Sequence, residues 1–327
     1  MSGGTLTRAF DNDWTGPALV SVIAIAVISF FQPSFLSAFN ITVLLSAIAV
    51  NMLVAYGQLV IIAIGQMNLA LGAVGGLAAI SFAGMMEVWG LPPLVAAAGG
   101  LAIGAGAGVA SGFIIARTGI SAFIITLAGL QVFKGVNLGI TEAQPFYNVP
   151  QSVKDFGNLT LFGPIPWLVL PALLAAVLMW YVLARLRIGR HILAVGGNRH
   201  AAELSGIDVG RTVIWAHAIS GMLAATAGMM LVARLQLGHP TIGDDWLISS
   251  FAAPVIGGAI LAGGHVSVAG AFFGVVIIAI ITQALVLFAI DPFVVQIVLG
   301  GLILWAVGIN RLREVRVAKL LGQAGRA

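Results

Sequence analysis

The sequence predicts an all-α membrane protein, a single polytopic bundle of about ten transmembrane helices over residues 1–327. The chain is 60% hydrophobic and only 8% charged, whereas about a quarter of the residues of a soluble domain are charged. Residues 14–86, 73 in all, contain no Asp, Glu, Lys or Arg. One span needs roughly 20 apolar residues, so this run alone holds about three helices. No stretch alternates in polarity as the strands of a membrane barrel do.

Turn-forming residues divide the apolar runs into ten predicted spans. The spans cover residues 17–36, 41–64, 68–86, 92–116, 120–140, 165–184, 212–232, 246–262, 266–290 and 292–309. The first follows a charged segment containing Arg8, Asp11 and Asp13, and no small-residue cleavage site follows it. We therefore expect an uncleaved first helix rather than a signal peptide. The chain has no cysteine, which excludes disulfides and thiolate metal ligands and leaves the redox compartment undecided.

Two amides and two glycines interrupt the junction of the second and third spans, in the stretch GQMNLALG at residues 65–72. We predict a helix break or pathway segment containing Gln66, Asn68 and Gly72, either at the cytoplasmic face or within the membrane. Asn68 suits a helix N-cap because its side-chain oxygen can accept from an unpaired backbone N–H. The later stretch GHVSVA has Ser267 in the place of Asn68. Matched interruptions of this kind predict an internal repeat around a central pathway.

Four glycines recur every four residues in the fourth span and so share one helix face. They are Gly100, Gly104, Gly108 and Gly112. Missing side chains let another backbone approach closely, so we predict that this face packs against a helix rather than lining a pore.

Two connections are long. Residues 141–164 are rich in turn formers, and residues 185–211 are basic and regular. Within the second connection, residues 198–204 predict a short helix with Asn198 as cap and Gly206 as terminator.

The distribution of cations orients the protein. Ten spans put both termini on one side, together with Arg8, Arg117, Arg185, Arg187, Arg190, Arg199, Arg211, Arg311, Arg313, Arg316, Lys319 and Arg326. Only Lys134, Lys154 and Arg234 fall on the other side. The positive-inside rule therefore predicts cytoplasmic termini, a cytoplasmic loop at 185–211 and a periplasmic loop at 141–164. The same loop cations explain the net charge of +4 without any nucleic-acid partner.

Enzyme motifs are missing from the sequence. It contains no Walker loop, no nucleophile elbow and no cluster of His, Asp and Glu with metal-ligand spacing. His217 stands alone in the seventh span, where we expect a structural role. No carboxylate lies unambiguously in the middle of a span, which argues against a proton-coupled transporter.

Five stretches, in order along nearly the whole chain, are similar to one known family. They are GQMNLALGAVGGLAAI, SGFIIARTGISAFIITLAGL, AVGGNRHAAELSGIDVGR, LVARLQLGHPTIG and APVIGGAILAGGHVSVAGAFFGV. They resemble bacterial importer permeases for ribose, xylose and related sugars. These permeases are the membrane subunits of ATP-binding-cassette importers and are related to branched-chain amino-acid permeases.

The resemblance implies the ten-helix permease fold of these importers, in a bacterial inner membrane. It implies a second permease copy or paralogue, two ATP-binding subunits beneath and a periplasmic solute-binding protein above. ATP and Mg would reside on the ATPase subunits, so this chain is expected to bind no cofactor or metal and to catalyse nothing. The segment that the ATPases push would consist of Gly196, Gly197, Asn198, Ala201, Ala202, Glu203, Leu204, Ser205, Gly206 and Ile207. Lys134, Lys154 and Arg234 are candidates for docking the binding protein.

The function implied is translocation of a sugar, polyol or similar small polar solute. Asn68 and Ala70 stand where the sugar family usually has Asp and Ser, and Asn with Ala also resembles the branched-chain amino-acid permeases. An importer of amino acids or nucleosides is therefore one alternative. An ion- or proton-coupled secondary transporter is another.

Overall fold

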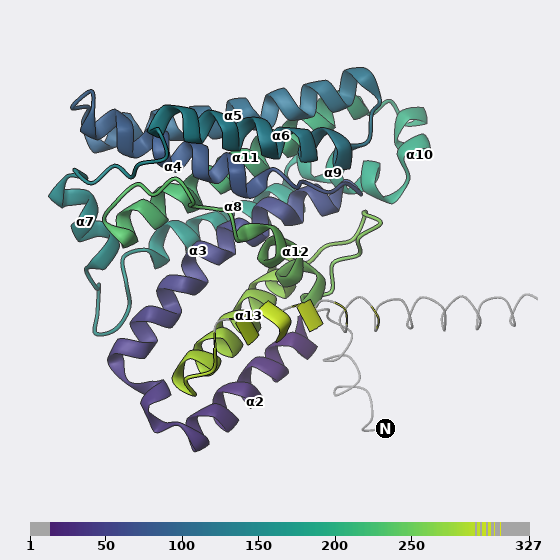
Figure 1. The fold of residues 1–327 in the computed structure, drawn as a ribbon. Helices are drawn as coiled ribbons and strands as arrows, with labels where there is room; N and C mark the ends of the chain where they lie inside the picture. Colours follow the sequence, from purple (N-terminus) through teal and green to yellow (C-terminus); the bar gives the residue numbers. More distant parts are fainter. Residues whose placement is uncertain are drawn as a thin grey trace, which may run out of the picture.

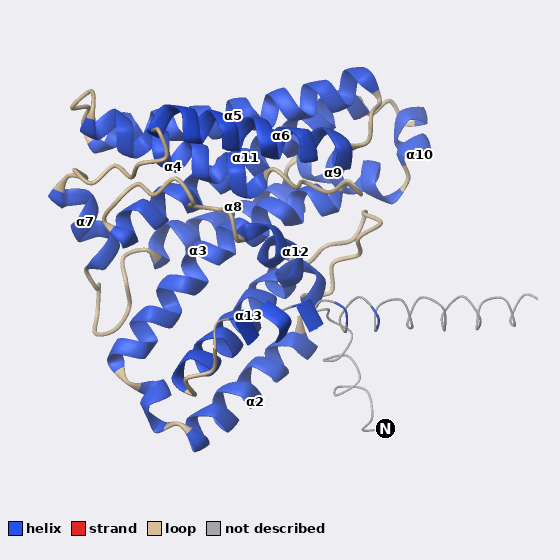
Figure 2. Ribbon diagram, viewed as in Figure 1, coloured by secondary structure: helices blue, strands red, loops and turns tan. Residues whose placement is uncertain are grey.

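The computed structural model describes residues 14–291 together with residues 293, 294, 296–298, 300, 301, 304 and 308. This part of the chain is a bundle of α-helices without a sheet (Figure 1, Figure 2). Its elements are α2 (Thr15–Phe31), η1 (Pro33–Leu36), α3 (Ala38–Ala63), α4 (Leu71–Glu87), α5 (Pro93–Thr118), α6 (Ala122–Thr141), α7 (Gln151–Asn158), α8 (Val169–Arg185), α9 (Arg187–Gly197), α10 (Arg199–Leu204), α11 (Val209–Leu235), α12 (Trp246–Ile256) and α13 (Val268–Leu287).

Nine of the predicted spans coincide with helices of the described residues: α2, α3, α4, α5, α6, α8, α11, α12 and α13. The tenth, residues 292–309, lies outside the described residues except for isolated positions. Arg8, Arg311, Arg313, Arg316, Lys319 and Arg326 lie outside them too. Several helices are shorter than predicted, among them α2 and α12. Pro33 lacks a backbone N–H and ends α2 at Phe31, and α12 ends before Gly257 and Gly258, the second of which has φ +86°.

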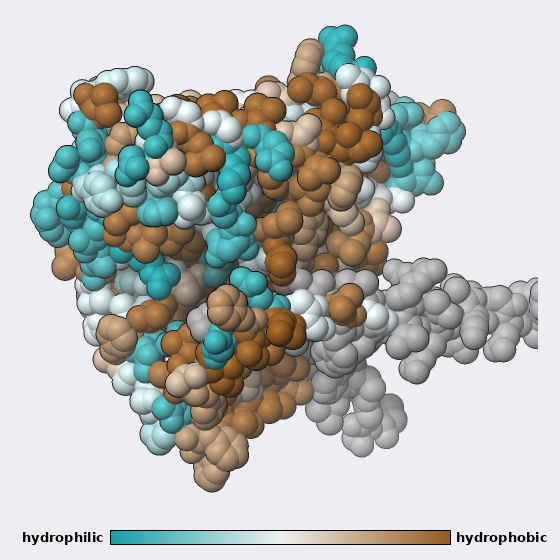
Figure 3. Space-filling view, viewed as in Figure 1, coloured by the Kyte–Doolittle hydropathy of each residue, from teal (hydrophilic) through white to brown (hydrophobic). Residues whose placement is uncertain are grey.

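Length and apolar composition qualify five of the described helices to cross a membrane: α3, α5, α6, α11 and α13. The pair α8 and α9, bent by 70°, makes a sixth if it is counted as one span, while α2, α4 and α12 are shorter apolar helices. Large apolar side chains are exposed along α2, α5, α6 and α8, and hydrophobic surface is broad in the space-filling view (Figure 3). The architecture is that of a polytopic, all-helical membrane protein.

Helix α11 is the most buried of the long helices and packs against α3, α4 and α5. Its contact with α5 depends on the four spaced glycines. A Cβ on Gly104 would meet the carbonyl oxygen of Gly221 and the Cβ of Ala225, and one on Gly108 would meet the carbonyl oxygen of His217. The two backbones thus approach as closely as small residues allow. Gly100 and Gly112 face α11 in the same way, against Met229 and Ile214.

A second group of helices, α2, α3 and α13, packs together below the α5–α6–α11 layer in the view of Figure 1. The long helix α3 belongs to both groups because it also contacts α11 and α12. Helix α7 lies at one end of the layer, while α9 and α10 lie at the opposite end (Figure 1). The two long connections therefore emerge at opposite ends of the bundle.

Two helices of the long connections were not predicted. Helix α9 bends away from α8 by 70° after the extended residue Leu186, and a Cβ on Gly189 would meet the carbonyl oxygen of Val182. Helix α7 buries Val153 and packs on α11, where a Cβ on Gly157 would meet the carbonyl oxygen of Ala233. The short helix predicted at residues 198–204 is confirmed as α10.

Candidate functional site

Between α3 and α4 the chain is non-helical over residues 64–70, in the stretch IGQMNLA. Helix α3 ends in a left-handed turn at Gly65, where φ is +71° and the N–H of Gln66 donates to the carbonyl of Ile61 (3.0 Å). Glycine adopts this conformation without strain. The chain then turns back along α3, so the break lies beside the helices and not beyond their ends.

Side chains from α3 and α6 satisfy the backbone of the break. With its amide oriented by the groups it faces, Gln58 on α3 donates to the carbonyl of Asn68 (3.1 Å) and accepts from its N–H (3.2 Å). Thr126 on α6 accepts from the N–H of Leu69 (3.1 Å). Non-helical backbone persists at membrane depth only where protein or water satisfies it, and here protein side chains do so.

Asn68 is buried and ties the break to α11. Its Nδ2 donates to Oγ of Ser220 (3.3 Å), the twelfth of the 27 residues of α11. Its Oδ1 accepts from the N–H of Ala70 (3.0 Å), two residues along the chain. The N-cap expectation was therefore wrong, because the cap position of α4 is Ala70 and Asn68 closes a local turn two residues earlier.

Gln66 faces a different residue of α11. Its Oε1 lies 3.0 Å from Nε2 of His217, and because this oxygen can only accept, Nε2 carries the proton. The other ring nitrogen, Nδ1, is buried with no hydrogen-bond partner among the described residues. The contact places His217 in a structural role, fixing the start of the break to α11.

A second non-helical segment, residues 236–245, lies between α11 and α12. It runs along α4 in the opposite direction. Gly238 lies against Ala83, and Gly243 contacts Gly72 through backbone atoms. Between these two contacts, a Cβ on Gly76 would meet the carbonyl oxygen of Ile242. Gly72, predicted at the first break, thus joins the starts of α4 and α12.

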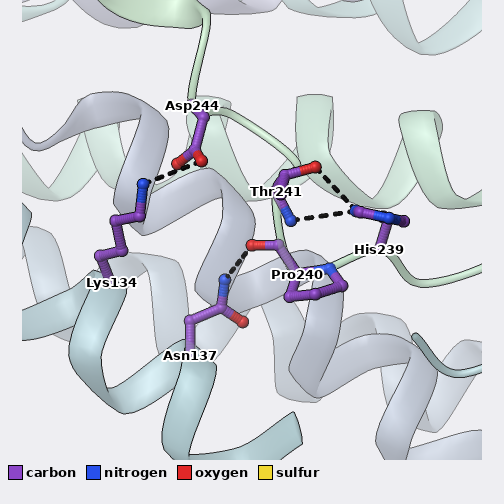
Figure 4. A network of polar contacts seen from close by, with 6 residues as sticks. All are labelled: Lys134, Asn137, His239, Pro240, Thr241 and Asp244. Atoms are coloured by element: carbon purple, nitrogen blue, oxygen red, sulfur yellow. Dashed lines mark hydrogen bonds and ion pairs between the residues drawn. The ribbon is translucent and has the colours of Figure 1, made fainter. Parts of the chain in front are cut away.

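Polar contacts fasten this second segment to α6 (Figure 4). Lys134 Nζ lies 2.9 Å from Oδ2 of Asp244, and Nδ2 of Asn137 donates to the carbonyl of Pro240 (2.8 Å). Within the segment, Oγ1 of Thr241 lies 2.7 Å from Nδ1 of His239.

The predicted ATPase-coupling segment comprises the end of α9, helix α10 and the turn after it. Asn198 caps α10 by accepting from the N–H of Ala201 (3.0 Å), and Gly206 follows the helix with φ +79°. Glu203 pairs with Arg199 at an exposed site (3.3 Å). The structure places the remaining predicted residues around these: Gly196 and Gly197 end α9, Ala201, Ala202 and Leu204 lie in α10, and Ser205 and Ile207 lie in the turn.

The end of α9 meets two other segments backbone to backbone. The N–H of Gly264 donates to the carbonyl of Ala63 at the end of α3 (3.0 Å). A Cβ on Gly196 would meet that carbonyl oxygen and the nitrogen of Gly264. Gly263 also lies against Gly65. We call this contact of residues 63–65, 196–197 and 262–264 the glycine junction.

The other predicted site residues are dispersed. Ser267 caps α13 by accepting from the N–H of Gly270 (3.0 Å), and it does not join Asn68. Lys154 lies on α7 and Arg234 in the last turn of α11, at the same end of the bundle. No group of His, Asp and Glu suited to a metal ion occurs in the part of the chain that the structure describes.

Sequence reasoning missed Gln58, Thr126 and Asp244. A signal existed for Gln58, which is a fully buried amide within an apolar span. Thr126 and Asp244 could not be recognised from spacing, because their partners lie 57 and 110 residues away in the chain.

Two non-helical segments that meet at Gly72 and Gly243 within an all-helical membrane bundle are typical of transport proteins of the channel or carrier kind. The chain belongs to the family described as branched-chain amino acid transport system / permease component, whose model matches residues 37–307. The resemblance drawn from the sequence is thereby confirmed.

Curated relatives cover most of the chain. It is 36% identical over 302 residues to the ribose import permease protein of Bacillus subtilis (strain 168), covering 91% of this chain and 93% of the relative. It is 32% identical to the D-allose transport system permease protein of Escherichia coli (strain K12), with 92% of each chain covered. It is also 32% identical to the fructose import permease protein of Rhizobium meliloti, covering 91% of this chain and 84% of the relative. No solved structure matches.

Proposed function

We propose that this chain translocates a sugar or similar polyhydroxylated solute as the membrane subunit of an ATP-driven importer. The observation that carries the proposal is its similarity, over nine-tenths of its length, to permeases named for ribose, allose and fructose. The proposed assembly contains a second permease, two ATP-binding subunits that carry ATP and Mg, and a periplasmic solute-binding protein. It resides in a bacterial inner membrane.

We propose ten spans with cytoplasmic termini, and the two ends of the described bundle favour this orientation. Helix α7 and helices α9–α10 lie at opposite ends of the helices. The α9–α10 end carries several exposed Arg side chains, including Arg199 and Arg211, as cytoplasmic ends usually do.

The coupling segment is proposed to pass force from the ATPases through the glycine junction. Contacts between backbones cannot relax by a change of rotamer, so a displacement of α9–α10 moves the end of α3 and the α12–α13 connection together. Both the Gln66–Asn68 break and the start of α13 at Ser267 adjoin this junction. A displacement of α10 therefore acts on the Gln66–Asn68 break, and we propose that this break borders the pathway.

Docking of the binding protein is proposed at the α7 end. Lys154 and Arg234 present cations there, whereas the ammonium of Lys134, the third candidate, is engaged by Asp244. Reversing the charge of Lys154 and Arg234 together should weaken binding-protein affinity at low salt, because exposed charge pairs act mainly through long-range attraction. Unchanged affinity at low salt would remove this role.

An amino-acid importer is the second candidate, favoured by Asn68 and Ala70 at the break and by the family's description. A thermal-shift screen of the partner binding protein against sugars, polyols and amino acids separates the two. We expect stabilisation by a sugar or polyol, and stabilisation by amino acids alone would contradict the proposal.

The energy source is tested in whole cells. Uptake should survive collapse of the proton gradient and stop when ATP is depleted. The reverse pattern would indicate a secondary transporter.

A further inference from the structure

The segment 236–245 enters the bundle deeply. Its contacts with α4 run from Ala83 at Gly238 to Gly72 at Gly243, and 11 residues of helix correspond to about 16 Å at 1.5 Å per residue. The segment thus descends from the α7 end of α4 to its first turn. Asp244, at the foot of this descent, is the residue before the cap position of α12.

Its partner is equally deep. Lys134 is the thirteenth of the 20 residues of α6, so roughly 10 Å of helix separates it from the end at Thr141. Thr126, which binds the first break, lies about 12 Å further along the same helix. The Lys134–Asp244 pair therefore lies in the interior of a span whose exposed side chains are mostly apolar, with Gln131 as an exposed polar one.

Despite this depth the pair is open on one side. The side chains of Lys134 and Asp244 are 38% and 42% exposed, and Thr241 is exposed beside them. A hydrophilic band runs down this face between α6 and α12 in the space-filling view (Figure 3). The same segment lines a cavity of about 330 Å³ through His239, Thr241 and Asp245 among others.

An ion pair facing hydrocarbon at this depth is strongly unfavourable, and charged residues within spans almost always face water or protein. The non-helical backbone of 236–245 has the same requirement, since irregular backbone at membrane depth is tolerated beside a cavity or within protein. Two independent features thus exclude lipid from this face and require water or further protein there.

We propose that Lys134 and Asp244 line the water-filled solute pathway and bind hydroxyl groups of a polyhydroxylated solute as it passes. A carboxylate accepts from two hydroxyls at once, and an ammonium donates up to three hydrogen bonds. The pair thus offers a sugar both hydrogen-bond donors and acceptors, and its own net charge is zero. The identity of the ligand in this inference rests on the proposed function. The inference that this face is filled with water does not rest on it.

The absence of native cysteine makes accessibility directly measurable. Asp244→Cys and Thr241→Cys are compared with Val136→Cys in membranes containing the complete importer, using a charged methanethiosulfonate on both membrane faces. Val136 lies on α6 two residues from Lys134 and is 45% exposed. Only the thiolate reacts, and it forms in water and not in lipid. We expect the two segment cysteines to react at least about tenfold faster than the control, and sugar to slow them.

Thr241→Cys keeps the Lys134–Asp244 pair and serves if Asp244→Cys does not fold. Equal rates at positions 241 and 136 would overturn the inference. If the segment cysteines react quickly but sugar neither slows them nor is taken up, the pathway stands and the proposed sugar ligand fails. If sugar is taken up while the segment cysteines are inert, only the present inference fails.

Uptake kinetics then separate solute binding from support of the fold. Asp244→Asn should raise the sugar concentration for half-maximal uptake roughly tenfold or more, because a charged acceptor is lost. The exchanged variant Lys134→Asp with Asp244→Lys restores an ion pair but reverses its polarity, so the increase should persist. Full recovery in the exchanged variant, or no increase in Asp244→Asn, would show that the pair only fastens the segment to α6.

Discussion

At the scale of single residues, a few buried amides and hydroxyls make an interrupted span possible. Asn68 closes the turn at Ala70 and reaches Ser220, and Gln58 satisfies both backbone groups of Asn68. In an apolar interior each of these groups would cost free energy if left without a partner. The break is therefore stabilised by specific side chains from three helices.

Asn68→Ala should lower the melting temperature of the detergent-solubilised protein. It removes the acceptor of the Ala70 N–H and leaves buried polar groups unpaired, at a cost of about 1–3 kcal/mol. Asn68→Asp retains the acceptor at Oδ1 and should be milder. Asn51→Ala, at a partly buried residue of α3, is the control. An equal loss at positions 51 and 68 would contradict the role given to Asn68.

The sequence predicted the position of this site but not its geometry. Amides and glycines in an apolar run indicated that the helix is interrupted at residues 65–72. The partners could not be predicted because Ser220 lies 152 residues away from Asn68. The preference of asparagine for N-cap positions also placed the cap at Asn68, two residues before Ala70, the residue at the cap position of helix α4.

At the scale of elements, small residues decide which helices touch. The four-spaced glycines of α5 all face α11, and Gly72, Gly75 and Gly76 leave room on α4 for Gly243, Trp246 and Ile242. Each approach is close enough that one added methyl group would collide with a neighbour. The helix surfaces without such glycines, on α6 and α8, stay largely exposed.

Gly104→Leu should separate α5 from α11 and reduce the folded yield and melting temperature, by several kcal/mol if overpacking follows its usual cost. Gly106→Leu is the matched control, because nothing lies within 4 Å of a Cβ there. Leucine is also a better helix former than glycine, so this control should be neutral or stabilising. Similar losses in both variants would show that helix contact is not the cause.

Apolar runs predicted nine of the described helices because burial in lipid depends mainly on composition and length. They could not reveal α7 and α9, whose sequences mix charged and apolar residues, although Ile188, Ile192 and Val195 in α9 recur at helical spacing. The course of the segment that leads into the eighth predicted span was missed for a related reason. Residues 236–245 contain the turn formers of an ordinary loop, and only the fold shows that they run along α4.

At the scale of the whole molecule, the glycine junction brings the proposed coupling segment against both the first break and the α12–α13 connection. Gly196 lies against Ala63 and Gly264, while Gly263 lies against Gly65. Movement of α9 and α10 therefore reaches the first break directly and α13 through one short connection.

Gly196→Ala should uncouple the importer. Its Cβ would overlap the carbonyl oxygen of Ala63, so the end of α9 must shift away from α3. We expect a large loss of uptake while ATP hydrolysis by the assembled complex continues. Gly197→Ala should behave as wild type, because the nearest atom to its Cβ is 3.9 Å away. Wild-type uptake by Gly196→Ala would refute the junction as the coupling route.

The first break also bears on how the chain enters the membrane during synthesis. Gln58 is made with the break, but Thr126, His217 and Ser220 follow it by 57 to 152 residues. A nascent chain that ends before α11 therefore cannot give Gln66 and Asn68 the partners that they have in the complete protein. The α3–α4 pair must keep these polar groups hydrated or within the insertion machinery until α11 arrives. Its final integration into the bilayer is thus a late event of biogenesis.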